Sequence, residues 1–117
     1  MGAPVVWFEV AGRDLPTLTA FYEKLLGWKV DADNPMRYGM VDTASEGGIP
    51  GGIFATGDAD PEYVTFYADV PDVPASLKQA EKLGGKVLVE PRQIDGGATI
   101  AMLSDPEGHP VGLIQQP

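Results

Sequence analysis

The sequence predicts an α+β fold made of two tandem βαβββ units, because an internal repeat coincides with matching helix and strand patterns. Within residues 6–27, eight residues are identical to the residue 58 positions later. The pattern Gly-X-Pro-X-Gly also occurs twice, at positions 48–52 and 108–112. Chance would produce about one or two identities over such a window, so an internal repeat explains the pattern better. The pairs 58 residues apart are Val6/Val64, Phe8/Phe66, Asp14/Asp72, Pro16/Pro74, Glu23/Glu81, Lys24/Lys82, Leu25/Leu83 and Gly27/Gly85.

The first unit is predicted to cover about residues 4–56. Residues 5–10 are rich in β-branched and aromatic side chains, which indicates a strand. Asp14 can cap a helix that ends at Gly27. Three more strands are predicted at 28–31, 37–43 and 49–55. The apolar residues that recur at helical spacing are Leu15, Leu18, Tyr22, Leu25 and Leu26.

The second unit is predicted to cover about residues 62–116 and to repeat this order. A strand at 63–70 precedes a helix that Asp72 opens and that Gly84 and Gly85 end. The apolar face of this helix comprises Val73, Leu77, Ala80 and Leu83. Further strands are predicted at 86–90, 98–104 and 111–115. The acidic connector, with Asp58, Asp60 and Glu62, is read as a solvated linker, with hard-cation binding as the second interpretation.

The composition predicts one folded domain over residues 1–117. The chain has 44% hydrophobic and 21% charged residues, which is typical of a globular protein. The absence of cysteine excludes disulfides and thiolate metal sites. No apolar run has the length that a bilayer requires, so we expect a cytoplasmic protein. The net charge of −9 disfavours nucleic acid and anionic membranes and favours a neutral or cationic small molecule.

The chain resembles the vicinal oxygen chelate superfamily, which includes glyoxalase I, bleomycin-resistance proteins, extradiol dioxygenases and fosfomycin-resistance enzymes. The resemblance rests on the tandem βαβββ order, on FYEKLLGW at 21–28 and on DPEGHPVGLI at 105–114. It implies strands curled into a cup, with the helices outside and a ligand cleft within. It also implies a homodimer.

The resemblance implies that a metal would be held from the first and last strand of each unit. The matching residues are Trp7, Gly52, Thr65 and Gly112. A cation needs several N, O or S donors, whereas an indole N–H offers no lone pair and glycine has no side chain. Only a neutral threonine hydroxyl remains. We therefore expect no metal and no cofactor, which argues against glyoxalase, dioxygenase and metal-dependent epimerase chemistry.

Strand alternation predicts a ligand-binding face. Residues 6, 8 and 10, and likewise 64, 66 and 68, are assigned to the helix side. The opposite face is predicted to carry aromatic and acidic side chains, with two glycines leaving space for a ligand. An aromatic ligand could stack on Trp7 or Tyr67, and a cation could lie over their rings. The candidate ligand-binding residues are Trp7, Glu9, Gly52, Phe54, Thr65, Tyr67, Gly112 and Ile114.

Each candidate has a structural alternative. Trp7 could fill core volume, Glu9 could be a solvated strand residue, and Tyr67 could form a dimer contact. Asp69 could be a strand-end residue, and the pair at 51–52 could mark a bulge or a tight crossing. The sole histidine, His109, is read as a surface residue, and Asp105 and Glu107 as residues that shape the turn. The glycine pairs lack the residues of a phosphate loop.

Three functions remain open. The pattern favours a metal-free protein that binds a small aromatic or cationic molecule, as bleomycin-resistance proteins do. The alternative is an enzyme, either a metal-independent isomerase or lyase that uses Glu9 or Asp69 as a base, or a glyoxalase-like enzyme with non-standard metal ligands. The third is an interaction module without a small ligand. Whether the protein is an enzyme stays open, and binding without turnover is preferred.

Overall fold

The computed structural model describes residues 2–57, 61–94 and 96–117. Its described part has a mixed α+β fold with eight strands and two helices, in the order βαβββ-βαβββ, which confirms the predicted fold class. Asp58 and Asp60 of the predicted linker lie outside the described residues. The elements are β1 (Val5–Gly12), α1 (Leu15–Leu26), β2 (Lys29–Asp31), β3 (Gly39–Asp42), β4 (Gly51–Ala55), β5 (Tyr63–Asp69), α2 (Val73–Lys82), β6 (Lys86–Gln93), β7 (Thr99–Ser104) and β8 (Pro110–Gln115).

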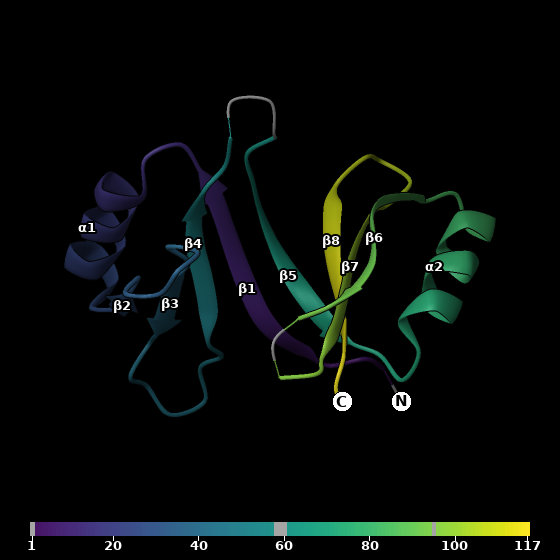
Figure 1. Cartoon of the computed structure of the whole chain (residues 1–117), viewed down its shortest axis with the longest axis horizontal. Helices are drawn as coiled ribbons and strands as arrows, with labels where there is room; N and C mark the ends of the chain where they lie inside the picture. The colour runs from purple at the N-terminus through teal and green to yellow at the C-terminus, as the bar shows by residue number, and fades with distance from the viewer. Residues whose placement is uncertain (1, 58–60, 95) are drawn as a thin grey trace. The chain divides into compact units, whose positions relative to one another are not determined.

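The chain forms two compact units, which we call the N-terminal unit (Trp7–Val64) and the C-terminal unit (Met1–Val6 with Thr65–Pro117). In the N-terminal unit the strand order is β2-β3-β4-β1, with β4 parallel to β1 and the other pairs antiparallel (Figure 1). The C-terminal unit has the equivalent order β6-β7-β8-β5, with β8 parallel to β5. The repeat seen in the sequence is therefore a repeat of strand connectivity.

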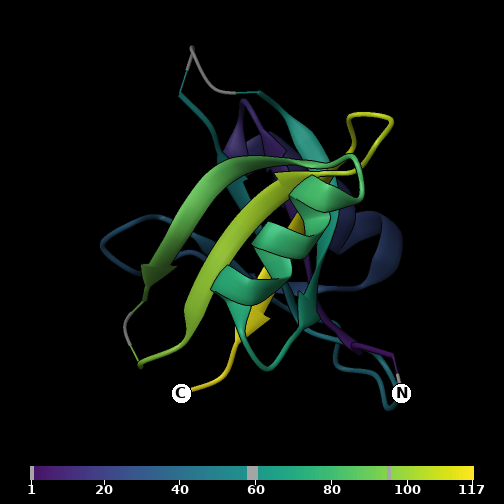
Figure 2. The same cartoon turned by 90° about the vertical axis from the view of Figure 1, so that its right-hand side faces the viewer.

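Both helices begin at the predicted aspartates. The Asp14 carboxylate accepts a hydrogen bond from the Thr17 N–H (3.1 Å), and the Asp72 carboxylate accepts one from the Ala75 N–H (3.0 Å). Helix α1 ends at Gly27, whose φ of 72° places it in the left-handed region that glycine tolerates. Figure 2 shows α2 lying over the strands of the C-terminal unit, where it contacts β6, β7 and β8. Neither described helix is long and apolar enough to cross a membrane.

Each unit buries apolar side chains between its helix and its strands. In the N-terminal unit, Val10, Val41 and Ile53 form the buried cluster, with Phe8 and residues of α1 packed against it. In the C-terminal unit, the cluster consists of Val73, Leu77, Ala101 and Leu113. The assignment of Phe8 and Val10 to the helix side is therefore confirmed.

Several apolar residues predicted for the helix side are instead exposed. On β5, Val64 is 71% exposed and Phe66 is also exposed. Within the C-terminal unit, α2 lies mainly against β6, β7 and β8. Leu83 is exposed beyond the end of α2. On α1, Leu25 and Leu26 are exposed, whereas Tyr22 packs against the cluster and stacks on Trp28. Helical spacing predicted the apolar stripes but not how much of each stripe is covered.

Candidate functional site

A hydrogen-bonded network centred on Glu9 lies in the N-terminal unit. Glu9 is buried, with only 6% of the residue exposed. The Tyr38 hydroxyl donates to Oε2 of Glu9 at 2.6 Å, and the Tyr63 hydroxyl donates to Oε1 at 2.7 Å. The indole N–H of Trp7 donates in turn to the Tyr38 hydroxyl at 3.1 Å. Both carboxylate oxygens thus accept a charge-assisted hydrogen bond, which holds the group in one orientation.

The residues of this network come from three separate segments. Trp7 and Glu9 share one face of β1, as strand alternation predicted, while Phe8 packs on the helix side. Tyr38 directly precedes β3, and Tyr63 is the first residue of β5. The alternative that Glu9 is solvated is wrong, because the two phenol side chains cover its carboxylate.

Sequence reasoning missed Tyr38 and Tyr63. A signal for Tyr63 existed, because it alternates with Thr65 and Tyr67 along β5 and so belongs to the same face. Tyr38 gives a weaker signal: the sequence predicts it within a strand at 37–43, whereas β3 starts one residue after it, at Gly39. Its contact with Glu9 joins residues 29 positions apart and depends on how β3, β4 and β1 are paired.

The side chain of Asn34 fixes the backbone of Tyr38. The Tyr38 N–H donates to Oδ1 of Asn34 (2.9 Å), and Nδ2 of Asn34 donates to the Tyr38 carbonyl oxygen (2.7 Å). The Arg37 N–H also donates to the Asn34 carbonyl oxygen (3.0 Å). This turn holds the Tyr38 ring at the point from which its hydroxyl reaches Glu9.

Gly52 allows the Tyr38 ring to reach Glu9. In the β1–β4 register Gly52 lies opposite Glu9, and a Cβ atom added to Gly52 would overlap the Tyr38 ring. The space that the sequence assigned to a ligand at Gly52 is therefore filled by Tyr38. On the other face a Cβ atom at Gly51 would overlap the Phe8 ring, so the tight-crossing interpretation of this glycine pair is confirmed.

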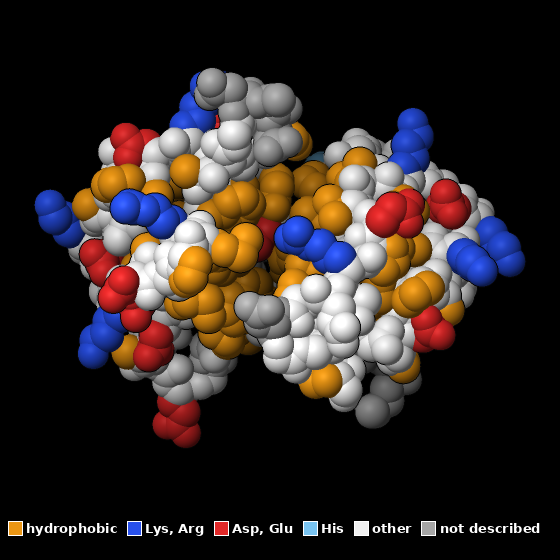
Figure 3. Space-filling view, in the orientation of Figure 1, with side chains coloured by type: hydrophobic (Ala, Val, Ile, Leu, Met, Phe, Trp, Pro, Cys, Tyr) orange, Lys and Arg blue, Asp and Glu red, His pale blue; other side chains and the backbone are white. Residues whose placement is uncertain are grey.

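Aromatic side chains surround the network. Phe54 stacks on Tyr38, with ring centroids 5.6 Å apart and planes inclined by 24°, and meets Tyr63 edge-on at 6.4 Å. Trp7, Tyr38, Phe54 and Tyr63 are all of intermediate exposure. Figure 3 shows hydrophobic side chains gathered over the strands of this unit. The arrangement combines one carboxylate with several partly exposed π-faces.

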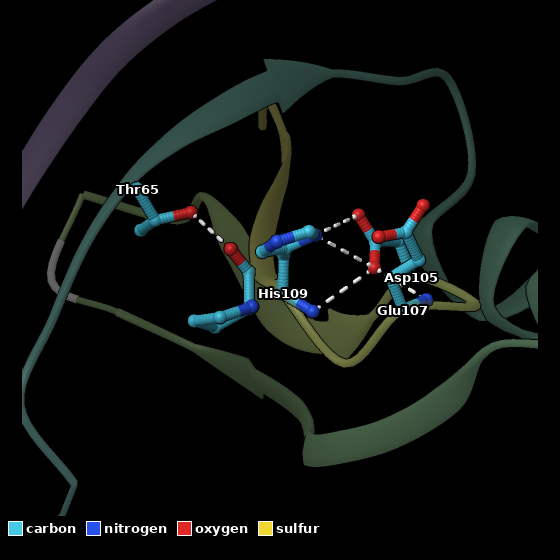
Figure 4. Close-up of polar contacts among 5 residues, drawn as sticks. Thr65, Asp105, Glu107 and His109 are labelled. Carbon is cyan, nitrogen blue, oxygen red and sulfur yellow. Dashed lines mark hydrogen bonds and ion pairs between the residues drawn. The ribbon is translucent and has the colours of Figure 1, made fainter.

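The remaining predicted site residues belong to the C-terminal unit. Tyr67 is buried, and its ring lies over Gly112, where an added Cβ atom would overlap it. The Thr65 hydroxyl donates to the Pro110 carbonyl oxygen at 2.6 Å (Figure 4). Asp69 ends β5, as predicted for a strand-end residue, and pairs in register with Ile114 of β8. The space predicted at Gly112 is thus filled by an aromatic ring, as it is at Gly52.

Asp105 organises the turn before β8. Its Oδ1 atom accepts hydrogen bonds from the backbone N–H groups of Glu107 and His109, both at 2.9 Å, and Nδ1 of His109 lies 2.9 Å from Oδ2 (Figure 4). The turn-shaping role predicted for Asp105 is confirmed, and His109 is exposed at the surface. The backbone N–H of His109 lowers the pKa of Asp105 below its usual 3.8, and the His109 ring acts in the same direction.

Acid titration should reveal this lowered pKa. A carboxylate whose pKa is lower in the folded state stabilises the fold above its unfolded pKa, and this contribution is lost as the pH falls through the folded value. We therefore expect wild type to be more stable than Asp105→Asn at neutral pH, and the difference to shrink below pH 3.8. Urea unfolding of both proteins across this range measures it. A difference that stays constant down to the lowest pH would contradict the prediction.

The positions that correspond to metal ligands do not fit a divalent cation. The Trp7 N–H is a donor and is used by Tyr38, and the Thr65 hydroxyl hydrogen is used by Pro110. Gly52 and Gly112 offer no side-chain atom, and tyrosine rings cover both. Within the part of the chain that the structure describes, no cluster of three or more His, Asp or Glu residues is arranged to hold a metal. These four positions therefore do not form a site for a divalent cation.

Comparison with known proteins identifies the family. The model of the glyoxalase-like domain family matches residues 7–114, which is almost the whole chain. The chain belongs to this family. Among solved structures it resembles a glyoxalase/bleomycin resistance protein/dioxygenase superfamily member from Vibrio splendidus 12B01, with a TM-score of 0.67, 17% identity and coverage of 98% of this chain and 100% of that one. The resemblance to the vicinal oxygen chelate superfamily is thereby confirmed.

Other similar proteins carry more specific names. Methylmalonyl-CoA epimerase from Mycobacterium tuberculosis matches with a TM-score of 0.66 and 16% identity, covering 97% of this chain and 87% of that one. The anthracycline biosynthesis protein DnrV from Streptomyces peucetius is 26% identical over 123 residues, which is 92% of this chain and 44% of that protein. DauV from Streptomyces sp. (strain C5) matches equally. The chain spans less than half the length of these two curated relatives.

Proposed function

We propose that this protein binds a small aromatic molecule at the Trp7–Glu9–Tyr38–Tyr63 network, with a cationic or hydrogen-bond-donating group of the ligand directed at Glu9. The observation that carries the proposal is the buried carboxylate, held by two phenol hydroxyls and surrounded by partly exposed aromatic rings. Ring stacking contributes about 0.5–1.5 kcal/mol beyond area burial. A cation over such rings adds about 0.5–2 kcal/mol.

The acidic composition of the chain and the names of its curated relatives both support an aromatic or cationic ligand. The chain has 17 acidic and 8 basic residues, which attracts cations and repels polyanions. The curated relatives DnrV and DauV are named as anthracycline biosynthesis proteins, and anthracyclines are flat, fused-ring aromatic compounds. We therefore propose a flat aromatic compound, with or without an amino group, as the class to test first.

Tryptophan fluorescence can report binding next to Glu9. The chain has two tryptophans, and Trp28 stacks on Tyr22 on the helix side of the strands. In the Trp28→Phe variant, Trp7 is the sole reporter, and we expect saturable quenching by an anthracycline that carries an amino sugar. The Trp7→Phe variant keeps Trp28 as the control reporter. Equal responses from the two variants, or no saturable response from Trp28→Phe, would argue against the proposed site. Calorimetry with unmodified protein checks that the quenching reflects binding.

A second candidate is a metal-independent enzyme in which Glu9 acts as a base. The specific observation is that both Glu9 oxygens are oriented by hydroxyl donors, as a positioned base requires. Hydrogen–deuterium exchange at a carbon of the bound compound, followed by NMR and absent in a Glu9→Gln variant, would distinguish this function from binding alone. Binding without exchange or turnover would favour the first candidate.

A further inference from the structure

The N-terminal unit has a hollow of about 430 Å³ that is not lined by any of the four residues of the Glu9 network. We propose that this hollow binds a small organic anion, a carboxylate or a phosphate ester with a short apolar group. Its lining combines two arginines with apolar side chains. The lining residues are Arg13, Asp14, Leu15, Pro16, Met36, Arg37 and Ala55.

The positive charge at the hollow is unusual for this chain. Only 8 of its 117 residues are Lys or Arg, against 17 Asp and Glu, and two of these 8 line this one hollow. Among the described residues, Arg37 makes no ion pair. Arg13 forms an ion pair with Glu62 through Nε at 2.6 Å, which offsets part of its charge, and its two terminal NH₂ groups carry further N–H donors. Guanidinium groups bind carboxylates and phosphates through paired N–H donors.

The acidic residue in the lining is already engaged. The Asp14 carboxylate caps α1 by accepting the Thr17 N–H at 3.1 Å, so part of its charge is offset by the helix N-terminus. It therefore opposes an anion less than a free carboxylate would.

The backbone of Arg37 is held in a conformation that arginine rarely adopts. Its φ is 51°, in the left-handed region that favours glycine. The Arg37 N–H donates to the Asn34 carbonyl oxygen, and the Asn34 side chain holds the next residue by two hydrogen bonds. Strained backbone of this kind is found preferentially at ligand-binding positions. Here it presents a guanidinium group at the hollow where glycine would fit the backbone better.

The apolar part of the lining favours an organic anion over a bare ion. Met36 is 80% exposed, the highest value among the exposed large hydrophobic residues of the described chain, and Leu15, Pro16 and Ala55 also line the hollow. A ring or short alkyl group could cover these side chains while its charged group meets the arginines. Phenyl phosphate and benzoate are small molecules that combine an apolar ring with an anionic group.

NMR titration of the ¹⁵N-labelled protein tests the proposal. We expect phenyl phosphate or benzoate to produce saturable shifts at the amides of Met36, Arg37 and Ala55. Whichever of the two binds more tightly identifies the charged group that the hollow prefers. Neutral phenol should bind about tenfold or more weakly, because it cannot make charge-assisted hydrogen bonds. Inorganic phosphate that binds as tightly as phenyl phosphate would overturn the proposal, since the apolar lining would then contribute nothing.

Substitution of Arg37 separates binding from folding. Arg37→Gly removes the guanidinium group but suits the left-handed backbone, so the variant should unfold at the same or a higher temperature than wild type. We expect its affinity for the tighter probe to fall by about tenfold. Arg92→Gln, which removes one charge from β6 of the C-terminal unit, should change the affinity by less than about twofold. Unchanged affinity in Arg37→Gly, or an equal loss in Arg92→Gln, would overturn the proposal.

Discussion

Gly52→Ala is expected to displace the Tyr38 ring from Glu9 and to lower the free energy of unfolding by about 1–3 kcal/mol, the usual cost of overpacking. The added methyl group would overlap the ring, and Gly52 lies on β4 directly opposite Glu9 in the strand register. The backbone of Tyr38 cannot easily retreat, because the Asn34 side chain holds its N–H and its carbonyl. Denaturant unfolding measures the loss of stability.

A double-mutant cycle shows whether the methyl group acts through Tyr38. In a Tyr38→Ala background the ring is absent, so Gly52→Ala should cost much less than it does in wild type. Gly2→Ala is the matched control, because it adds the same methyl group where no atom lies within 4 Å. Equal costs of Gly52→Ala with and without the Tyr38 ring would contradict this account of the site.

Glu9→Gln is expected to weaken binding of a cationic aromatic ligand by about tenfold or more, since a charged hydrogen-bond partner contributes about 1.5–3 kcal/mol. Binding of the same ring system without its amino group should change far less, because ring stacking remains. The substitution should also lower the free energy of unfolding by about 1–3 kcal/mol. Glutamine offers one carbonyl oxygen in place of two carboxylate oxygens, so one of the two tyrosine hydroxyls loses its acceptor.

The matched control for this prediction is Glu90→Gln. Glu90 is exposed on β6 of the C-terminal unit, so the substitution removes the same charge without touching the network. Calorimetric titration of both variants with the amino and the neutral compound gives four affinities for comparison. If Glu90→Gln weakened binding of the amino compound as much as Glu9→Gln, overall charge rather than a contact with Glu9 would be responsible.

The contacts of Glu9 show what strand alternation can predict and what it cannot. Alternation places Trp7 and Glu9 on one face of β1 and Phe8 on the other, and the structure agrees. It does not say what approaches that face from elsewhere in the chain. The partners Tyr38 and Tyr63 lie 29 and 54 residues away from Glu9, so their contacts depend on strand pairing and loop geometry.

The surroundings of Gly52 and Gly112 could likewise not be predicted from the sequence. A missing side chain predicts a space, and the sequence reading assigned the spaces at Gly52 and Gly112 to a ligand. In both units a tyrosine ring occupies the space, Tyr38 over Gly52 and Tyr67 over Gly112. Close packing fills small voids with the nearest large side chain, and which side chain is nearest is a tertiary property.

The sequence by itself determined the elements whose causes are local. The aspartate caps of both helices, the glycine that ends α1 and the Asp105 turn all follow from residues within a few positions of one another. The βαβββ order follows from local strand and helix patterns that recur in the two halves of the chain. Tertiary structure decided which groups meet: the tyrosines on Glu9, the arginines at one hollow and the uncovered part of β5. The physical reason is that capping and turn hydrogen bonds are short-range in sequence. Burial and side-chain contacts depend instead on the register and packing of segments that are distant along the chain.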